Sequence, residues 1–295
     1  MTTLLTIVLF GIYSGALLSI GAVGFSMQFG ITNVLNLAYG GVLTAAMYVD
    51  YYVIGGNSNV WAAIAVGAVG GALFSWMLGR GVVSSYVKRG TTLFGMAMVT
   101  IALGLVIQFG LEAIQGPGDY SFTVAQTSEV RIGSVTMSVL QLIVIGCAVL
   151  SMLAIHALLR YTTLGLAMRA TASDASLSRA CGVPTTRIRN AAWIISGALC
   201  GTAGVLLGIS TGSFNSTTGS GFFITLVAAA IIGGVGQPYG AMLGALIVGI
   251  TSEAAAALIS PAYKDIVAWG ILILVLLLRP QGIFAEFASQ RELVG

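Results

Sequence analysis

Apolar stretches long enough to cross a bilayer recur along almost the whole chain, and they restrict it to a membrane-spanning fold. A crossing helix needs roughly 20 consecutive apolar residues. Only 7% of the 295 residues are charged and 57% are hydrophobic, whereas a soluble domain carries about 25% charged residues. We therefore predict an all-α polytopic membrane protein that forms a single transmembrane domain over residues 1–295.

The charged residues between the apolar stretches indicate which loops lie on which side. Cytoplasmic loops carry an excess of Lys and Arg, so Arg80, Lys88 and Arg89 place their loop inside. The segment 115–133 has two acidic residues and a single arginine, which indicates an external loop. Alternation between the sides gives about nine crossings, or eight if one segment does not cross fully, with the N-terminus outside and the C-terminus inside. The predicted spans are residues 4–25, 30–54, 60–78, 93–113, 135–159, 191–209, 222–234, 241–259 and 266–278.

Two of these segments, residues 30–54 and 222–234, are the least regular. The first contains Asn33, Asn36 and Asp50 within an otherwise apolar sequence. Lipid offers no hydrogen-bond partners to such groups, which therefore belong against protein or a water-filled cavity. We predict broken or re-entrant helices here.

A short sequence within the first irregular segment recurs just after the second one. Residues 39–45 read YGGVLTA and residues 239–245 read YGAMLGA, so four of seven positions are identical at a separation of 200 residues. Interrupted helices in corresponding positions of two halves often flank the pathway of a transporter. The match predicts a two-half internal repeat, with chance similarity among common membrane residues as the alternative.

Glycine is the residue that most clearly indicates how the helices pack. Lipid gives helices no hydrophobic reason to associate, so close packing between small residues takes that role. The chain has 40 glycines, and several pairs are spaced four residues apart. These pairs are Gly11/Gly15, Gly67/Gly71, Gly197/Gly201, Gly204/Gly208 and Gly240/Gly244.

Polar residues inside or next to predicted spans, with the glycines beside them, are the candidates for lining a translocation pathway, because polar groups are costly in lipid and often functional. Hydrogen bonds that only hold helices together are the alternative. The pathway candidates are Asn33, Asn36, Tyr39, Gly40, Tyr239 and Gly240. Three carboxylates near predicted outer ends of spans would line an outer vestibule and attract an ammonium group, or would simply be hydrated at the interface. These carboxylates are Asp50, Glu112 and Glu253.

The longest segment without membrane-spanning hydrophobicity is residues 160–190. It holds five of the twelve basic residues and one acidic residue, Asp174, which places it in the cytoplasm. Thr171 and Asp174 form a Thr-x-x-Asp pattern that can cap the first turn of a helix, and Gly182 with Pro184 would end that helix. The Ala and Ser residues between them allow a partner to approach closely. We predict a docking helix, with a loop that merely joins two spans as the alternative.

Other kinds of chemistry find no support in the sequence. A Gly-x-x-x-x-Gly-Lys-Ser/Thr phosphate loop is absent, so we expect the chain not to bind or hydrolyse ATP itself. Cys147, Cys181 and Cys200 have neither metal-binding nor redox spacing. We therefore expect no enzymatic activity, no metal site and no cofactor in this chain. The net charge of +3 lies on predicted inner loops and requires no nucleic-acid partner.

Residues 160–190 resemble the cytoplasmic coupling loop of ABC importer permeases, in the form carried by the branched-chain amino acid permease family. The matching residues are Gly165-Leu166-Ala167-Met168-Arg169-Ala170, Asp174, Ala180, Gly182 and Pro184. Residues 30–40, 231–240 and 278–284 are similar to other parts of that family, so the resemblance covers nearly the whole chain. Tyr39 stands where the family commonly has His, which argues against any role that needs an imidazole there.

The resemblance implies a permease subunit of an ABC importer for branched-chain or related amino acids in the bacterial inner membrane. It also implies a second homologous permease subunit, two cytoplasmic ATPase subunits that use the ATP, and a periplasmic substrate-binding protein. The expected ATPase-coupling residues are Gly165, Arg169, Ala170, Asp174, Arg179, Gly182 and Pro184. The alternatives are a permease for urea, short amides or another small polar solute, and an ATP-independent channel or carrier.

Overall fold

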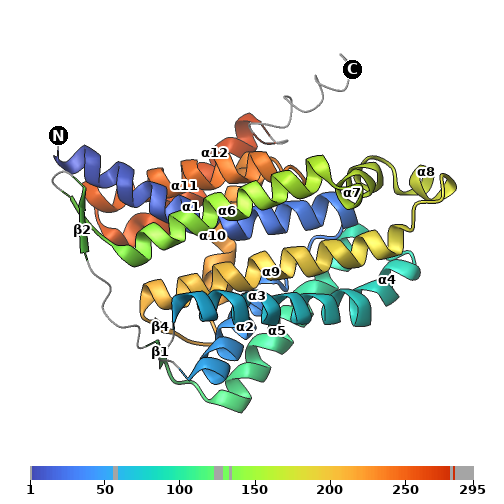
Figure 1. The fold of residues 1–295 in the computed structure, drawn as a ribbon, viewed down its shortest axis with the longest axis horizontal. Helices are drawn as coiled ribbons and strands as arrows, with labels where there is room; N and C mark the ends of the chain where they lie inside the picture. Colours follow the sequence, from blue (N-terminus) through green and yellow to red (C-terminus); the bar gives the residue numbers. More distant parts are fainter. Residues whose placement is uncertain (1, 56–58, 123–128, 133–134, 280–281, 283–295) are drawn as a thin grey trace.

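A computed structural model describes residues 2–55, 59–122, 129–132, 135–279 and 282, and most of these residues are helical (Figure 1). Within this part of the chain, seven helices are long and apolar enough to cross a membrane. They are α1 (Thr2–Thr32), α3 (Val60–Met77), α5 (Leu93–Gln115), α6 (Val139–Tyr161), α9 (Thr185–Thr211), α11 (Pro238–Leu258) and α12 (Lys264–Leu278). The span of α3 continues in helical conformation to Lys88, and the span of α12 includes the turn that starts at Pro261. The predicted all-α polytopic class is confirmed. Most of the family-like segment 278–284 lies outside the described residues.

The connecting segments gather at opposite ends of the molecule (Figure 1). One end holds the N-terminus and two small antiparallel strand pairs. These pair β1 (Tyr120–Ser121) with β4 (Ser213–Phe214), and β2 (Glu129–Ile132) with β3 (Val135–Ser138). The other end holds three short helices, α4 (Ser84–Lys88), α7 (Thr163–Ser173) and α8 (Ala175–Ala180). Predicted external and predicted cytoplasmic segments are thus separated, and we call these ends outer and inner.

Close glycine contacts join α3 to α9. The two helices run antiparallel, and a Cβ atom added to Gly201 would overlap the carbonyl oxygen of Gly67. A Cβ atom on Gly71 would likewise overlap the carbonyl oxygen of Gly197. Two of the glycine pairs found in the sequence therefore meet each other. Only glycine lets these two backbones approach so closely.

The predicted break in the second segment is present, but it lies later than its predicted start at Gly30. The first span was predicted to end at residue 25, whereas α1 continues to Thr32. Asn33 then adopts a left-handed conformation with φ 51°, which Asn tolerates better than most residues. The chain stays non-helical to Ala38, and α2 (Tyr39–Ile54) follows. Ser26, Gln28 and Thr32 obscured the end of α1 in the sequence, because these polar side chains are buried inside the bundle.

Thr100 of α5 satisfies the exposed backbone of this break. Its hydroxyl donates to the carbonyl oxygen of Leu35 (2.9 Å) and accepts from the N–H of Leu37 (3.2 Å). Non-helical backbone at membrane depth needs such partners, because lipid supplies none. The break is therefore stabilised by a neighbouring span.

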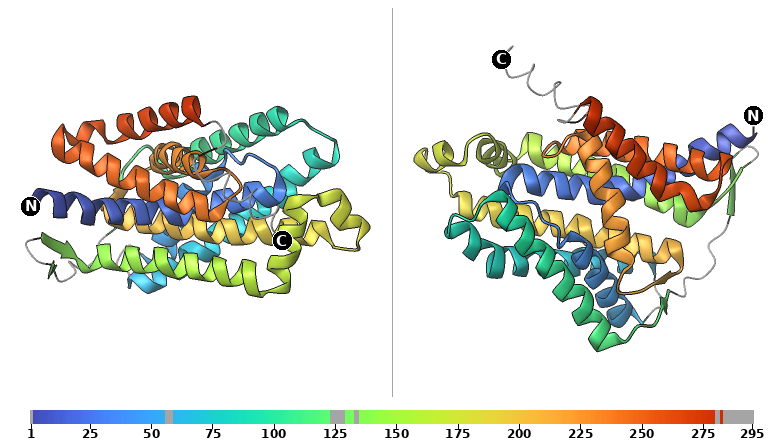
Figure 2. Two further views of the ribbon diagram at one scale, coloured as in Figure 1. Left: turned by 90° about the horizontal axis from the view of Figure 1, so that it is seen from above. Right: turned by 180° about the vertical axis from the view of Figure 1, so that it is seen from behind.

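The other irregular segment forms α10 (Thr218–Gly233), which lies across the direction of the long helices (Figure 2). It starts four residues earlier than predicted, because residues 218–221 are helical rather than part of an external turn. The ring of Phe223 on α10 packs against Phe25 of α1 and Tyr39 of α2, with centroids 5.7 and 6.0 Å apart. This aromatic cluster marks the point where the two shorter helices meet α1.

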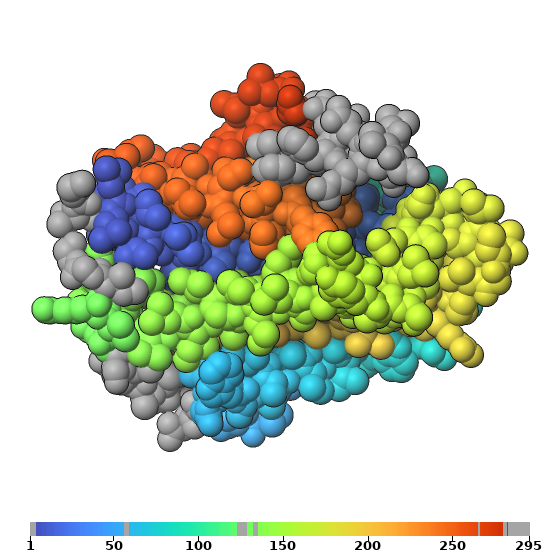
Figure 3. Space-filling view, turned by 45° about the horizontal axis from the view of Figure 1, so that its top comes forward, coloured from blue at the N-terminus to red at the C-terminus, as the bar shows by residue number. Residues whose placement is uncertain are grey.

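The spans differ greatly in how much of their surface the chain itself covers. In α9, 78% of the most apolar stretch is buried, against 11% in α5 and 12% in the α12 region. Figure 3 shows α6 along one face, with α7 and α8 projecting beyond the inner end. Helix α9 is thus the centre of the bundle, and α5 and α12 lie at its edge.

Candidate functional site

The inner projection consists of α7 and α8, and it is anchored by the first of these helices. Gly165 lies so close to the last turn of α6 that a Cβ atom would overlap the carbonyl oxygen of Leu158. Met168 is fully buried and packs in a cluster with Ile155, Leu159 and other residues of α1, α6 and α9. Gly165 and Met168 therefore hold α7 firmly against the spans, so α7 and the ends of α6 and α9 form one packed unit.

Helix α8 begins differently from the prediction. Asp174 is itself the N-cap residue: its Oδ1 accepts from the N–H groups of Ser176 (2.7 Å) and Leu177 (3.0 Å). Thr171 does not cap this helix, because it lies inside α7 and donates its hydroxyl to Ala167. The predicted pairing of Thr171 with Asp174 at one helix start is therefore wrong. The continuation of α7 to Ser173 moves the start of α8 to Ala175.

The end of α8 agrees with the sequence prediction. Gly182 has a φ of +83°, a left-handed conformation that favours glycine. The N–H of Val183 then donates to the carbonyl oxygen of Ser178 (2.9 Å). Pro184 immediately precedes α9. The result is a short rigid helix on a tight turn between two spans.

The outward surface of this projection combines charge with two large exposed apolar side chains, Leu166 on α7 and Leu177 on α8. Leu177 is 61% exposed at the middle of α8. Arg169, Ala170 and Arg179 are also exposed. The seven predicted coupling residues thus divide into those that shape the projection (Gly165, Asp174, Gly182 and Pro184) and those that form its surface. Leu177 was not singled out from the sequence, since a lone leucine in an Ala/Ser helix carries no signal of exposure.

A buried polar cluster lies where the break meets α1 and α9. The Gln28 side-chain oxygen accepts from the Ser196 hydroxyl (2.8 Å) and from the Asn36 amide (3.4 Å). The Tyr39 hydroxyl lies within hydrogen-bond distance of the carbonyl oxygens of Gly21 (3.1 Å) and Ser196 (3.2 Å). Gln28 Nε2 and Asn36 Oδ1 have no partner among the described residues. The sequence identified Asn36 and Tyr39, but it gave no sign that Gln28 and Ser196 would join them.

The other pathway candidates are not part of this cluster. Asn33 is exposed at the end of α1, and Gly40 packs against α10 near Gly219. Tyr239 is 44% exposed and its hydroxyl contacts His156 Nδ1 (2.8 Å). Gly240 lies in the tight contact between α10 and α11, beside Gly233. Both YG-containing sequences begin a helix, but the surroundings of their tyrosines differ.

A cavity of about 450 Å³ opens near the outer end, between α1, α9, α10, α11 and α12. Glu253 lies in it, accepts a hydrogen bond from the Ser14 hydroxyl (2.6 Å) and forms an ion pair with Lys264. Leucine and phenylalanine side chains complete the lining, together with Ser and Thr hydroxyls. The cavity thus offers both charge signs beside an apolar surface.

The three predicted vestibule carboxylates do not share this cavity. Asp50 is fully buried in α2, and its two oxygens have no hydrogen-bond partner among the described residues. Glu112 is half-buried in the last turn of α5 and does not line the cavity. Only Glu253 of the three lines this cavity.

The sequence matches a known family of membrane proteins over most of its length. A model of the family described as branched-chain amino acid transport system / permease component matches residues 7–276. The chain belongs to this family. This permease is 30% identical to the high-affinity branched-chain amino acid transport system permease protein LivH of Escherichia coli K12, over 94% of each chain. It is 29% identical to BraD of Pseudomonas aeruginosa, again over 94% of each chain.

A second type of permease is also similar to this one. LivM of Salmonella typhimurium, described as a high-affinity branched-chain amino acid transport system permease protein, is 26% identical over 92% of this chain and 68% of its own length. No solved structure matches this permease. Its family and its apolar helices make it a multi-pass protein of the inner membrane.

The cap of α8 makes this part of the permease sensitive to pH. The Ser176 hydroxyl, followed by the backbone N–H groups of Leu177 and Ser176, holds the pKa of the Asp174 carboxyl below its ordinary value. A carboxylate with a lower pKa in the folded state stabilises that state above its unfolded pKa and loses the effect as pH falls through the folded value. The cap is therefore complete at neutral pH and weakens below about pH 4.

We expect Asp174→Ala to speed amide hydrogen exchange in residues 177–183 by about fivefold at pH 7, because the first turn of α8 loses its acceptor. Asp174→Asn retains a side-chain oxygen and should exchange close to the wild-type rate. The difference between the wild type and the Ala variant should shrink as the pH falls through the lowered pKa of Asp174. Equal acceleration in the Asn and Ala variants at pH 7 would contradict the capping role.

Proposed function

We propose that this chain is the membrane-spanning permease subunit of an ABC importer for branched-chain amino acids, moved by a separate ATPase. The observation that supports this most directly is α8, a capped helix at the inner end that exposes Leu177 to water. An exposed leucine on a rigid helix suits docking into an apolar groove. In this proposal the chain itself catalyses no reaction and holds no cofactor, and the partner subunit uses the ATP.

The proposed mechanism follows from the way the projection is attached. Helix α7 is packed against α6 and α9 through Gly165 and Met168, so a displacement of α8 is transmitted to both spans. Two ATPase subunits that change their separation on binding ATP would therefore tilt α6 and α9, together with α3, which is packed closely on α9, relative to the remaining helices. Such rigid-body motion of one bundle against another produces alternating access.

The proposed assembly contains a second homologous permease, two ATPases and a periplasmic substrate-binding protein. The similarity of this chain to both LivH and LivM supports a pair of related permeases. The poorly covered spans α5 and α12 leave apolar surface at the edge of the bundle. A second membrane subunit is a suitable partner for part of that surface, and lipid for the rest.

The outer cavity supports an amino acid as the solute. Glu253 would attract an ammonium group and Lys264 a carboxylate, while the apolar part of the lining would accept an aliphatic side chain. Urea and short amides carry no such pair of charges. The relatives' printed names, which refer to branched-chain amino acid transport, agree with this choice.

The test is uptake into proteoliposomes that contain the chain, its co-expressed ATPase and second permease, and the binding protein outside. We expect accumulation of leucine that requires ATP inside, and no accumulation of urea or acetamide. Glu253→Gln should lower leucine uptake at subsaturating concentration about tenfold, because a charge-assisted hydrogen bond is lost. Glu129→Gln is the matched control, since Glu129 is exposed at the same end and lies outside the cavity.

Two outcomes would contradict the proposal. Leucine equilibration by the chain alone, without ATPase, would indicate a channel or carrier. ATP-dependent accumulation of urea or an amide in preference to leucine would keep the importer class and overturn the substrate.

A further inference from the structure

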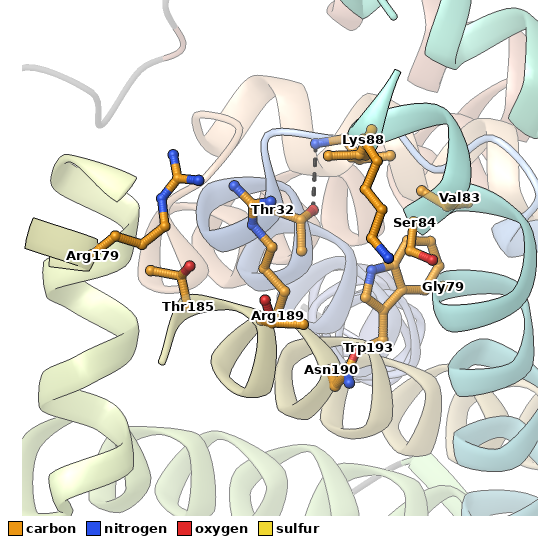
Figure 4. A pocket seen from close by; sticks show the side chains of 13 residues that line it. Thr32, Gly79, Val83, Ser84, Lys88, Arg179, Thr185, Arg189, Asn190 and Trp193 are labelled. Atoms are coloured by element: carbon orange, nitrogen blue, oxygen red, sulfur yellow. Dashed lines mark hydrogen bonds between the residues drawn. The ribbon is translucent and has the colours of Figure 1, made fainter. Parts of the chain in front are cut away.

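A second cavity lies at the inner end, beside the projection, and its lining is strongly basic (Figure 4). It has a volume of about 340 Å³ and lies between α4, α8, the first turns of α9 and the end of α1. Lys88, Arg179 and Arg189 reach it from three different helices. The described residues that line it include no aspartate or glutamate. Three cations thus converge on a space that contains no opposing side-chain charge.

The charges of this cavity are poorly compensated by the protein. Arg189 Nε is buried and has no hydrogen-bond partner among the described residues. Arg179 adds electrostatic repulsion to Arg189, and Asp174, whose carboxylate attracts Arg179, does not line the cavity. Buried donors without acceptors and unneutralised like charges both destabilise a structure. An anion between these helices would remove both defects.

The lining also defines the chemical class of that anion. Thr32, Ser84, Thr185 and Asn190 add neutral hydrogen-bonding groups around the three cations. An amino-acid zwitterion is a poor occupant, because its ammonium group would face only cations and neutral groups. A phosphate group has several strong acceptor oxygens and pairs well with guanidinium groups. Basic pockets between helices on the cytoplasmic side are also typical sites for lipid head groups.

We propose that this cavity binds a phosphate group and thereby links α8 to α4 and α9. The phosphate comes either from an anionic lipid of the inner leaflet or from a soluble phosphate in the cytoplasm, because the cavity lies at the inner end of the molecule. Its occupation holds the projection in one position relative to α3 and α4. The site is separate from the outer cavity, and its existence does not depend on the transported solute.

Trp193 provides a direct way to detect binding. Its indole lines the cavity and packs against Gly79, so an anion bound beside it should change its fluorescence. The experiment uses the full chain in phosphatidylcholine nanodiscs, with Trp61, Trp76 and Trp269 replaced by Phe. Inorganic phosphate is titrated in one arm, and phosphatidylglycerol replaces part of the lipid in the other.

We expect a saturable change in one of the two arms, and the arm that responds identifies the source of the phosphate. Arg189→Gln should weaken the apparent affinity about tenfold. Arg187→Gln should leave it unchanged, because Arg187 is exposed on the same helix and does not line the cavity. The same lipids are also tested by native mass spectrometry on the chain with all its tryptophans, in case the Phe variant folds poorly.

No saturable response in either arm and no retained phosphatidylglycerol would overturn the proposal. An equal loss in the Arg187 and Arg189 variants would also overturn it, because the effect would then reflect general positive charge. Since the measurement needs neither ATPase nor transport, a negative result here leaves the importer proposal intact. Conversely, a failure of leucine uptake would not contradict the proposed phosphate site.

Discussion

Replacing Gly201 by leucine is expected to prevent α3 and α9 from packing, and with them the bundle from folding. A Cβ atom at this position already overlaps the Gly67 carbonyl oxygen, and α9 is the most deeply buried span. Inserting methylenes into a packed core typically costs about 1–3 kcal/mol, and a clash with rigid backbone lies at or above the top of that range. We expect little or no monodisperse protein by size-exclusion chromatography in detergent, and a fall in the thermal unfolding midpoint of any that remains.

Gly146→Leu is the matched control for this prediction. Gly146 lies in the middle of α6, and a Cβ atom there meets nothing within 4 Å. The same substitution should therefore leave yield and unfolding midpoint close to wild type. Normal folding of the Gly201 variant would show that the two helices do not depend on close backbone contact.

Replacing Leu177 by aspartate is expected to abolish docking of the ATPase while leaving the membrane domain folded. The side chain is 61% exposed, so its loss removes little from the interior of the chain. Within the proposed interface it becomes the central apolar anchor, and losing such an anchor costs about 2 kcal/mol or more. Affinity for the ATPase should fall at least about thirtyfold, and ATP-driven leucine uptake should disappear.

The measurement is co-purification of the ATPase with the tagged permease, followed by titration on immobilised protein. Leu258→Asp is the control, because Leu258 is 74% exposed at the end of α11, on the opposite side of the membrane from α8. Docking that survives in the Leu177 variant but fails in the Leu258 variant would mean that the ATPase binds the end of the protein opposite to α8, which would contradict the proposal.

Composition and charge were sufficient to predict the class of fold, the opposite ends of the bundle and the position of the projection. The glycine spacing also predicted which residues pack closely. It did not predict their partners, because Gly67 and Gly201, which pack against each other, lie 134 positions apart in the sequence. Nothing local in either helix specifies the other.

The orientation of α10 and the burial of the carboxylates could not be predicted from the sequence, for physical reasons. Residues 222–233 are apolar on every face apart from Thr225, and such a helix has the same pattern whether it crosses the bilayer directly or lies across its neighbours. Asp50 and Glu253 have similar positions near the ends of predicted spans, yet one is fully buried and the other lines a cavity. Only the packing of neighbouring helices distinguishes them.

The pairing of Thr100 with the break after α1 links the interior of the protein to its lipid-facing rim. A single hydroxyl on the least covered span serves both Leu35 and Leu37, and hydrogen bonds of 2.9 and 3.2 Å are lost after a displacement of about 1 Å. A shift of α5 along the membrane normal would therefore leave the carbonyl oxygen of Leu35 and the N–H of Leu37 without their hydrogen-bond partner inside the bundle. Bilayer thickness influences the position of such a peripheral helix along the membrane normal. A change in thickness would therefore alter the stability of the non-helical backbone between α1 and α2.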